Sequence, residues 1–126
     1  MTQILVVDDN PMVRKLLGVA LSRHFSVSEA EDGLSAFEAI ARHMPQMVFL
    51  DIMMPSANEG LELLERLRGD ARTRHILVAM VTSRNDDEDR ALCLVKGADA
   101  FFSKPFNLRE ITQWATTHLR PTGSEK

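Results

Sequence analysis

The chain has 126 residues, 44% hydrophobic and 26% charged, which favours one globular domain, expected over residues 1–120 with a polar tail at 121–126. A net charge of −3 argues against nucleic-acid binding by this domain, and no apolar run approaches the roughly 18 residues of a membrane span. The single cysteine, Cys93, excludes an internal disulfide, and the N-terminus has no signal-peptide pattern, so we expect a cytoplasmic protein.

Short apolar runs alternate with amphipathic stretches along the whole chain. This alternation predicts an α/β domain built on a parallel sheet. The expected strands are residues 4–7, 25–30, 47–50, 76–81 and 100–103, of which 25–30 has the weakest pattern. Continuously hydrophobic strands of this kind are typical of a sheet that is buried on both faces.

The amphipathic stretches predict helices over residues 11–24, 34–43, 60–68, 86–96 and 108–119. Asn10 and Asn107 suit the caps of the first and last helices, and Pro11 suits a first turn. Helical spacing predicts the buried stripes. In the first helix the stripe consists of Met12, Leu16, Val19 and Ala20, with Leu17 as a further candidate. In the fourth helix it consists of Ala91 and Leu94, and in the last helix of Leu108, Ile111, Ala115 and Leu119.

Polar residues capable of chemistry follow or end four of these strands, namely Asp8, Asp9, Asp51, Thr82 and Lys104. Ligands of open parallel sheets bind beyond the carboxyl ends of the strands, so we expect these side chains to converge. Neighbouring carboxylates repel one another unless a cation intervenes, and Mg²⁺ prefers such oxygen ligands. With a hydroxyl and an ammonium beside them, the carboxylates suit phosphoryl transfer to an aspartate.

Each of these residues alone has a simpler structural interpretation. An aspartate after a strand is usually a helix cap or turn former, and a lone lysine is usually a solvated surface charge. The occurrence of all of them at the ends of four strands is harder to obtain by chance. The joint pattern therefore favours the functional interpretation.

Four segments carry a close resemblance to a known family: residues 6–10 (VVDDN), 51–55 (DIMMP), 81–83 (VTS) and 97–106 (GADAFFSKPF). They resemble the receiver domain of two-component response regulators, and the resemblance covers residues 3–119. It implies a flavodoxin-like, doubly wound (βα)5 fold with a five-stranded parallel sheet of order 2-1-3-4-5. It also implies that Asp51 accepts a phosphoryl group from a histidine kinase or a histidine phosphotransfer protein.

The resemblance further implies a role for each remaining site residue. Mg²⁺ would be held by Asp9, Asp51 and the backbone carbonyl of Met53, with Asp8 acting mainly through a water molecule. Thr82 and Lys104 would bind the phosphoryl oxygens, and the bond between Lys104 and Pro105 would be cis. Thr82 and Phe101 would form the switch, with Phe101 turning into the space that Thr82 vacates.

Three apolar residues lie off the predicted helix stripes, namely Leu92, Val95 and Trp114. They either form a partner face for a downstream protein target or a fused output domain, or mark a half-buried boundary. One departure from the family pattern is an extra residue between Pro55 and Gly60, which lengthens the loop after Asp51.

Three other functions compete with this interpretation. A phosphatase that forms an aspartyl-phosphate needs a second acid two residues after the nucleophile, where this chain has Met53. A flavin-binding module needs a phosphate loop after the first strand, where the acidic pair Asp8 and Asp9 would repel phosphate. A receiver that has lost its chemistry and serves only for docking would not need the intact acids. We therefore expect a signalling domain that at most phosphorylates and dephosphorylates itself.

Overall fold

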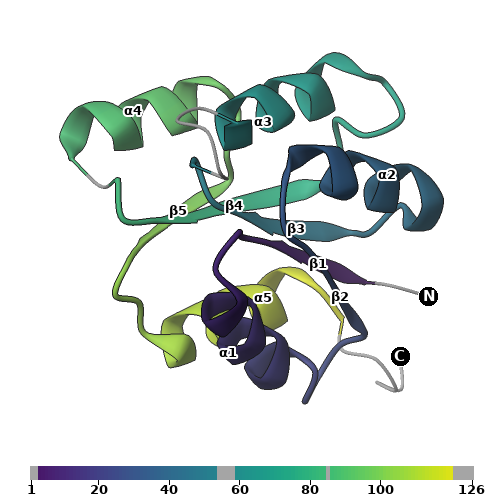
Figure 1. The fold of residues 1–126 in the computed structure, drawn as a ribbon, viewed down its shortest axis with the longest axis vertical. Helices are drawn as coiled ribbons and strands as arrows, with labels where there is room; N and C mark the ends of the chain where they lie inside the picture. The colour runs from purple at the N-terminus through teal and green to yellow at the C-terminus, as the bar shows by residue number, and fades with distance from the viewer. Residues whose placement is uncertain (1–2, 54–58, 85, 121–126) are drawn as a thin grey trace.

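A computed structural model describes residues 3–53, 59–84 and 86–120 of the chain. Its centre is a five-stranded parallel sheet in the order β2-β1-β3-β4-β5, which confirms the predicted fold (Figure 1). The strands are β1 (Ile4–Val7), β2 (Val27–Ala30), β3 (Met47–Leu50), β4 (Leu77–Thr82) and β5 (Ala100–Ser103). Every residue of β1 and β3 is buried, as expected for the inner strands of a sheet covered on both faces.

Helices cover both faces of the sheet. They are α1 (Pro11–Leu21), α2 (Gly33–His43), α3 (Glu59–Gly69), α4 (Asp87–Val95) and α5 (Leu108–His118). Figure 1 shows α2, α3 and α4 on one face and α1 and α5 on the other. The predicted helices are all present, and the largest shift is at α1, which ends at Leu21 instead of near His24.

Side-chain caps fix where the helices begin. The Asn10 side chain accepts hydrogen bonds from the amides of Met12 and Val13, and the Asn107 side chain does the same for Arg109 and Glu110, as predicted. Each cap satisfies amide groups that have no partner inside the helix. Since Asn10 follows Asp8 and Asp9 directly, its cap also fixes where the loop that carries these acids ends.

Two hydrophobic layers hold the helices on the sheet. Inner strand residues alternate between them: Leu5, Val7, Val48 and Leu50 face α2, α3 and α4, whereas Ile4, Val6, Met47 and Phe49 face α1 and α5. The predicted stripe of α5 is confirmed, because Ile111 and Ala115 are buried and Leu108 and Leu119 pack beside them.

The predicted stripe of α4 is wrong, and in that of α1 only the further candidate Leu17 is confirmed as buried. Helix α1 buries Leu17 and Leu21, whereas Met12 is 65% exposed and Val19 is 61% exposed. Apolar residues occupy two adjacent stripes of this helix, so periodicity alone does not say which of them faces the sheet. On α4 the buried residue is Cys93, and both Ala91 and Leu94 are exposed.

Two expectations fall outside the described part of the chain. The polar tail at residues 121–126 lies beyond it, as do residues 54–58, which include most of the lengthened loop after Asp51. Among the residues that the structure describes, no helix combines the length and apolar character that crossing a membrane requires.

Candidate functional site

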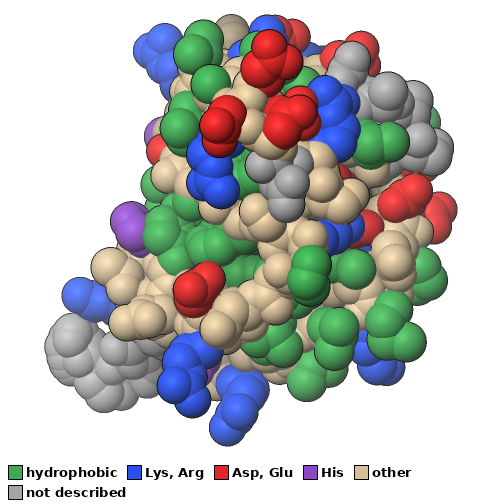
Figure 2. Space-filling model, turned by 90° about the vertical axis from the view of Figure 1, so that its left-hand side faces the viewer, with side chains coloured by type: hydrophobic (Ala, Val, Ile, Leu, Met, Phe, Trp, Pro, Cys, Tyr) green, Lys and Arg blue, Asp and Glu red, His purple; other side chains and the backbone are tan. Residues whose placement is uncertain are grey.

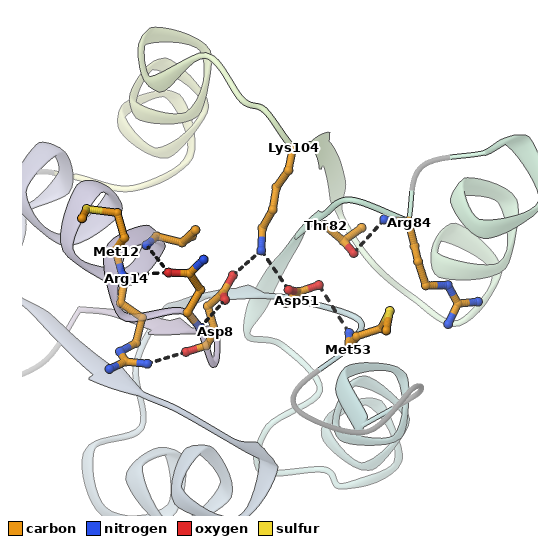
Figure 3. A network of polar contacts seen from close by, with 10 residues as sticks. Asp8, Met12, Arg14, Asp51, Met53, Thr82, Arg84 and Lys104 are labelled. Carbon is orange, nitrogen blue, oxygen red and sulfur yellow. Dashed lines mark hydrogen bonds and ion pairs between the residues drawn. The ribbon is translucent and has the colours of Figure 1, made fainter.

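The carboxyl ends of β1, β3, β4 and β5 bring the predicted polar residues to one edge of the sheet (Figure 3). Val7 of β1 lies opposite Leu50 of β3, so the residues that follow them, Asp8 and Asp51, emerge side by side. The amide of Asp51 donates to the carbonyl of Val7 at 3.2 Å, which continues the strand pairing as far as this acid. Strand register therefore positions the two carboxylates.

Lys104 joins the two acids directly. Its Nζ lies 2.7 Å from Oδ2 of Asp8 and 2.9 Å from Oδ2 of Asp51. Asp8 and Asp51 are buried, whereas Asp9 is exposed at the rim. The peptide bond between Lys104 and Pro105 is cis, as the resemblance implied. An ammonium group thus lies between two carboxylates that follow different strands, β1 and β3.

Burial and pairing act in opposite directions on these groups. Burial raises the pKa of Asp8 above its usual value, and the hydrogen bonds from Lys104 and the Asn10 amide only partly offset this. Burial also disfavours the charged form of Lys104, but its bonds to Asp8 and Asp51 outweigh that effect and raise the Lys104 pKa. Burial and pairing together thus leave the pKa values of both Asp8 and Lys104 raised.

The acid cluster suits a hard divalent cation. Asp8, Asp9 and Asp51 each offer a carboxylate oxygen, and these oxygens lie within 4.8 Å of one another. Carboxylates plus water make up the ligand set that Mg²⁺ prefers. Three carboxylates facing one ammonium also leave negative charge that such an ion would balance. The amide of Met53 donates to Oδ1 of Asp51 at 3.3 Å, while the predicted role of its carbonyl stays a prediction.

Thr82 and Phe101 lie on the neighbouring strands β4 and β5. The buried Thr82 ends β4, and its Oγ1 accepts a hydrogen bond from the amide of Arg84 at 3.2 Å. Phe101 on β5 is half-buried against the α2–α3–α4 layer, and the guanidinium of Arg90 lies 4.6 Å from its ring centre. Phe102 points to the opposite layer, where it is half-buried against the core.

The predicted partner residues differ in their surroundings. On α4, Leu92 is 39% exposed and Val95 is 83% exposed. Trp114 on α5 is half-buried, with its ring in edge contact with Phe49 and Phe102. Figure 2, a view from the α4–β5–α5 side, shows hydrophobic side chains gathered left of the centre of this face, with acidic and basic side chains above them.

Sequence reasoning missed three polar contacts near the acids. Nη1 of Arg14 donates to the backbone carbonyl of Asp8 at 2.7 Å, and the Asn10 amide donates to Oδ1 of Asp8 at 2.9 Å. Arg84 forms an ion pair with Asp89 at 2.8 Å. The position of Arg14 in the first turns of α1 was visible in the sequence, but its target is a backbone atom that no residue pattern reveals.

The comparison with protein families decides what this arrangement is. Residues 4–116 match the family described as the response regulator receiver domain. The chain belongs to this family. It is a phosphoacceptor signalling domain of two-component systems, a class in which binding of Mg²⁺ is typical. The alternative of a phosphatase is not favoured.

Relatives of the receiver domain are regulators of greater length. It is 37% identical over 110 residues to the phosphate regulon transcriptional regulatory protein PhoB of Klebsiella pneumoniae, covering 86% of this chain and 48% of PhoB. It is 39% identical over 125 residues to the response regulator MprA of Mycobacterium sp. (strain KMS), covering 98% of this chain and 53% of MprA. The chain thus spans about half the length of the curated relatives it matches.

Solved structures agree with the fold. The receiver domain of NtrX from Brucella abortus has a TM-score of 0.82 and 32% identity, over 90% of this chain and 95% of that one. A CheY-like receiver domain protein from Methanospirillum hungatei JF-1 has a TM-score of 0.83 and 26% identity, over 93% and 92% of the two chains.

Proposed function

We propose that Asp51 is the phosphoacceptor and takes its phosphoryl group from the phosphohistidine of a histidine kinase or a histidine phosphotransfer protein. The observation that supports this proposal is the position of Lys104. Its ammonium group forms ion pairs with both Asp51 and Asp8 and so supplies positive charge beside the acceptor oxygen. In the transfer, an oxygen of Asp51 bonds to phosphorus while the donor's P–N bond breaks. The electron pair of that bond leaves on the imidazole nitrogen.

The same proposal assigns the metal ligands. Asp9, Asp51 and the backbone carbonyl of Met53 would hold Mg²⁺, with Asp8 acting mainly through water. A bound ion would supply positive charge next to the phosphoryl oxygens. Support comes from the spacing of the three carboxylates and from the raised pKa of the buried Asp8, which a nearby cation would lower. Thr82 and Lys104 would bind the remaining phosphoryl oxygens.

Phosphorylation would then reach the surface through Thr82 and Phe101. The Thr82 hydroxyl would leave the Arg84 amide for a phosphoryl oxygen, and Phe101 would move into the vacated space. Such a local charge change can bias an element that has two stable positions. The readout surface in this proposal contains Leu92, Val95 and Trp114.

We propose the receiver domain at residues 1–120, with 121–126 as a tail or the start of a linker. The names of the longer relatives PhoB and MprA support a downstream protein target or a fused output domain as the partner. In this proposal the receiver domain itself binds no nucleic acid, acts in the cytoplasm, and has no enzymatic activity beyond phosphorylating and dephosphorylating itself.

Substitution of the acceptor tests the assignment. With Mg²⁺ and acetyl phosphate, we expect the wild type to gain one phosphoryl group by intact-protein mass spectrometry and Asp51→Asn to gain none. Asp87→Asn, at an exposed acid at the start of α4, is the matched control and should label like the wild type. Labelling of Asp51→Asn at the wild-type level would refute the assignment, and rapid multiple turnover of a generic phosphate ester would favour a phosphatase.

A further inference from the structure

Arg14 connects helix α1 to the loop that carries the acids. Its Nη1 donates to the backbone carbonyl of Asp8 at 2.7 Å, and its Nε donates to Oε1 of Glu29 on β2 at 3.1 Å (Figure 3 shows the first contact). The Arg14 side chain is only 17% exposed, whereas that of Glu29 is 46% exposed. A planar guanidinium held at two points has little freedom to reorient.

The carbonyl that Arg14 holds belongs to the peptide unit between Asp8 and Asp9. Because a peptide unit is planar, fixing this carbonyl fixes the direction in which the backbone enters Asp9. The rest of Asp8 is already fixed: its amide donates to Ala30, and its carboxylate accepts from Asn10 and Lys104. Asp9 is exposed, and the orientation of its backbone limits the directions in which its carboxylate can point.

We propose that Arg14 is a positioning residue for the metal site, acting through the peptide unit that joins Asp8 and Asp9. The proposal rests on the proposed function, in which these acids hold Mg²⁺. Groups that orient metal ligands without touching the metal typically change metal affinity 10- to 100-fold when they are removed. The ion pair with Glu29 offsets the positive charge of Arg14, so its contribution to the site is geometric.

A simpler role for Arg14 is to fasten α1 to β2 through Glu29. The two roles predict different effects. A fastening residue changes the stability of the metal-free protein and leaves the affinity of the folded protein for metal unchanged. A positioning residue changes the affinity of the folded protein as well.

The test uses Mn²⁺, which shares the preference of Mg²⁺ for carboxylate and water ligands. Free Mn²⁺ is measured by electron paramagnetic resonance, and Mg²⁺ titrations followed by the amide NMR signals of Asp9 and Asn10 provide a second readout.

Three variants separate the possible contributions of Arg14. Arg14→Met keeps the aliphatic part of the side chain and removes the hydrogen-bond donors, whereas Arg14→Lys keeps the positive charge without the planar guanidinium. Glu29→Gln removes the ion pair and keeps the donor to the Asp8 carbonyl. Lys15→Met, at the exposed neighbouring position, is the control.

We expect Arg14→Met to weaken Mn²⁺ binding by about tenfold or more. Arg14→Lys should fall between it and the wild type, Glu29→Gln should lose less than Arg14→Met, and Lys15→Met should bind like the wild type. Circular dichroism and thermal unfolding establish that each variant is folded. If Arg14→Met does not fold, Arg14→Lys decides, and a dissociation constant equal to that of the wild type overturns the proposal.

Two further results have separate meanings. Wild-type affinity in a folded Arg14→Met, or tighter binding caused by the loss of its charge, overturns the positioning role and leaves the proposed function intact. Failure of the wild type itself to bind Mn²⁺ or Mg²⁺ overturns the proposed function and this inference together.

Discussion

Lys104 lies between two buried carboxylates from different strands, so its removal should leave those charges unpaired. We expect Lys104→Met to destabilise the metal-free protein by about 1–3 kcal/mol, the usual cost of leaving a buried polar group without a hydrogen-bond partner. Added Mg²⁺ should stabilise this variant more than it stabilises the wild type. Urea unfolding with and without Mg²⁺ measures both effects.

The control for this prediction is Lys96→Met. Lys96 pairs with Glu65 at the protein surface, where ion pairs contribute about 0–1 kcal/mol. Equal losses of stability in the two variants would contradict the role given to Lys104.

The contribution of Lys104 to folding stability depends on pH with a definite sign, because the pKa of Lys104 is raised above 10.5 in the folded state. Its stabilising contribution is present below that pH and is lost as the pH rises through the raised pKa.

The residues of the acid cluster could be predicted because each one follows or ends an apolar strand, and parallel strands align their carboxyl ends. Their protein partners could be predicted only in part. Lys104 was recognisable from its place after β5, whereas the bond from Arg14 to the Asp8 carbonyl depends on the three-dimensional path of α1. Because every residue has a backbone carbonyl, the sequence does not show which carbonyl accepts a hydrogen bond from a side chain.

At the scale of elements, the start of α3 packs directly against the backbone of Asp51 and Ile52, which follow β3. The amide of Gly60 donates to Ile52 at 2.7 Å, and a Cβ atom at Gly60 would lie 1.7 Å from the Asp51 carbonyl oxygen. Gly60→Ala must therefore move α3 or Asp51. We expect a loss of stability of about 2 kcal/mol or more, as in overpacked cores, and slower labelling by acetyl phosphate.

Gly69, at the other end of α3, offers the matched substitution. A Cβ atom there would meet nothing within 4 Å. Gly69→Ala should therefore be neutral or stabilising by less than about 1 kcal/mol, with unchanged labelling. Thermal unfolding and phosphorylation kinetics of the two variants check the prediction, and similar behaviour of both would contradict the close packing of α3 on Asp51.

The elements also show the limits of periodicity. The stripe of α5 was predicted correctly because all its apolar residues except Trp114 occupy one face, whereas α1 carries Leu16 and Val19 beside the buried Leu17 and Leu21. Which of two adjacent stripes meets the sheet is decided by how the helix leaves β1. That direction is set by the loop from Asp8 to Asn10 and by tertiary packing.

At the scale of the whole molecule, Cys93 reports on global unfolding. Its side chain is fully buried, and burial, with help from the charge of Asp89, raises its pKa to about 11. We expect iodoacetamide at pH 8 to modify the native protein at least about a hundredfold more slowly than the urea-unfolded chain. Mg²⁺ should slow the native reaction further by stabilising the folded state. Rapid native labelling that Mg²⁺ does not change would contradict this arrangement.

The central claim, that Asp51 receives the phosphoryl group, is tested most directly by locating the group after transfer from a phosphorylated histidine kinase. Borohydride reduction converts an aspartyl-phosphate into a stable product, and peptide mass spectrometry then identifies the modified residue. We predict modification of Asp51 that depends on Mg²⁺. Modification at another residue, or transfer that is unaffected by removal of the metal, would contradict the account.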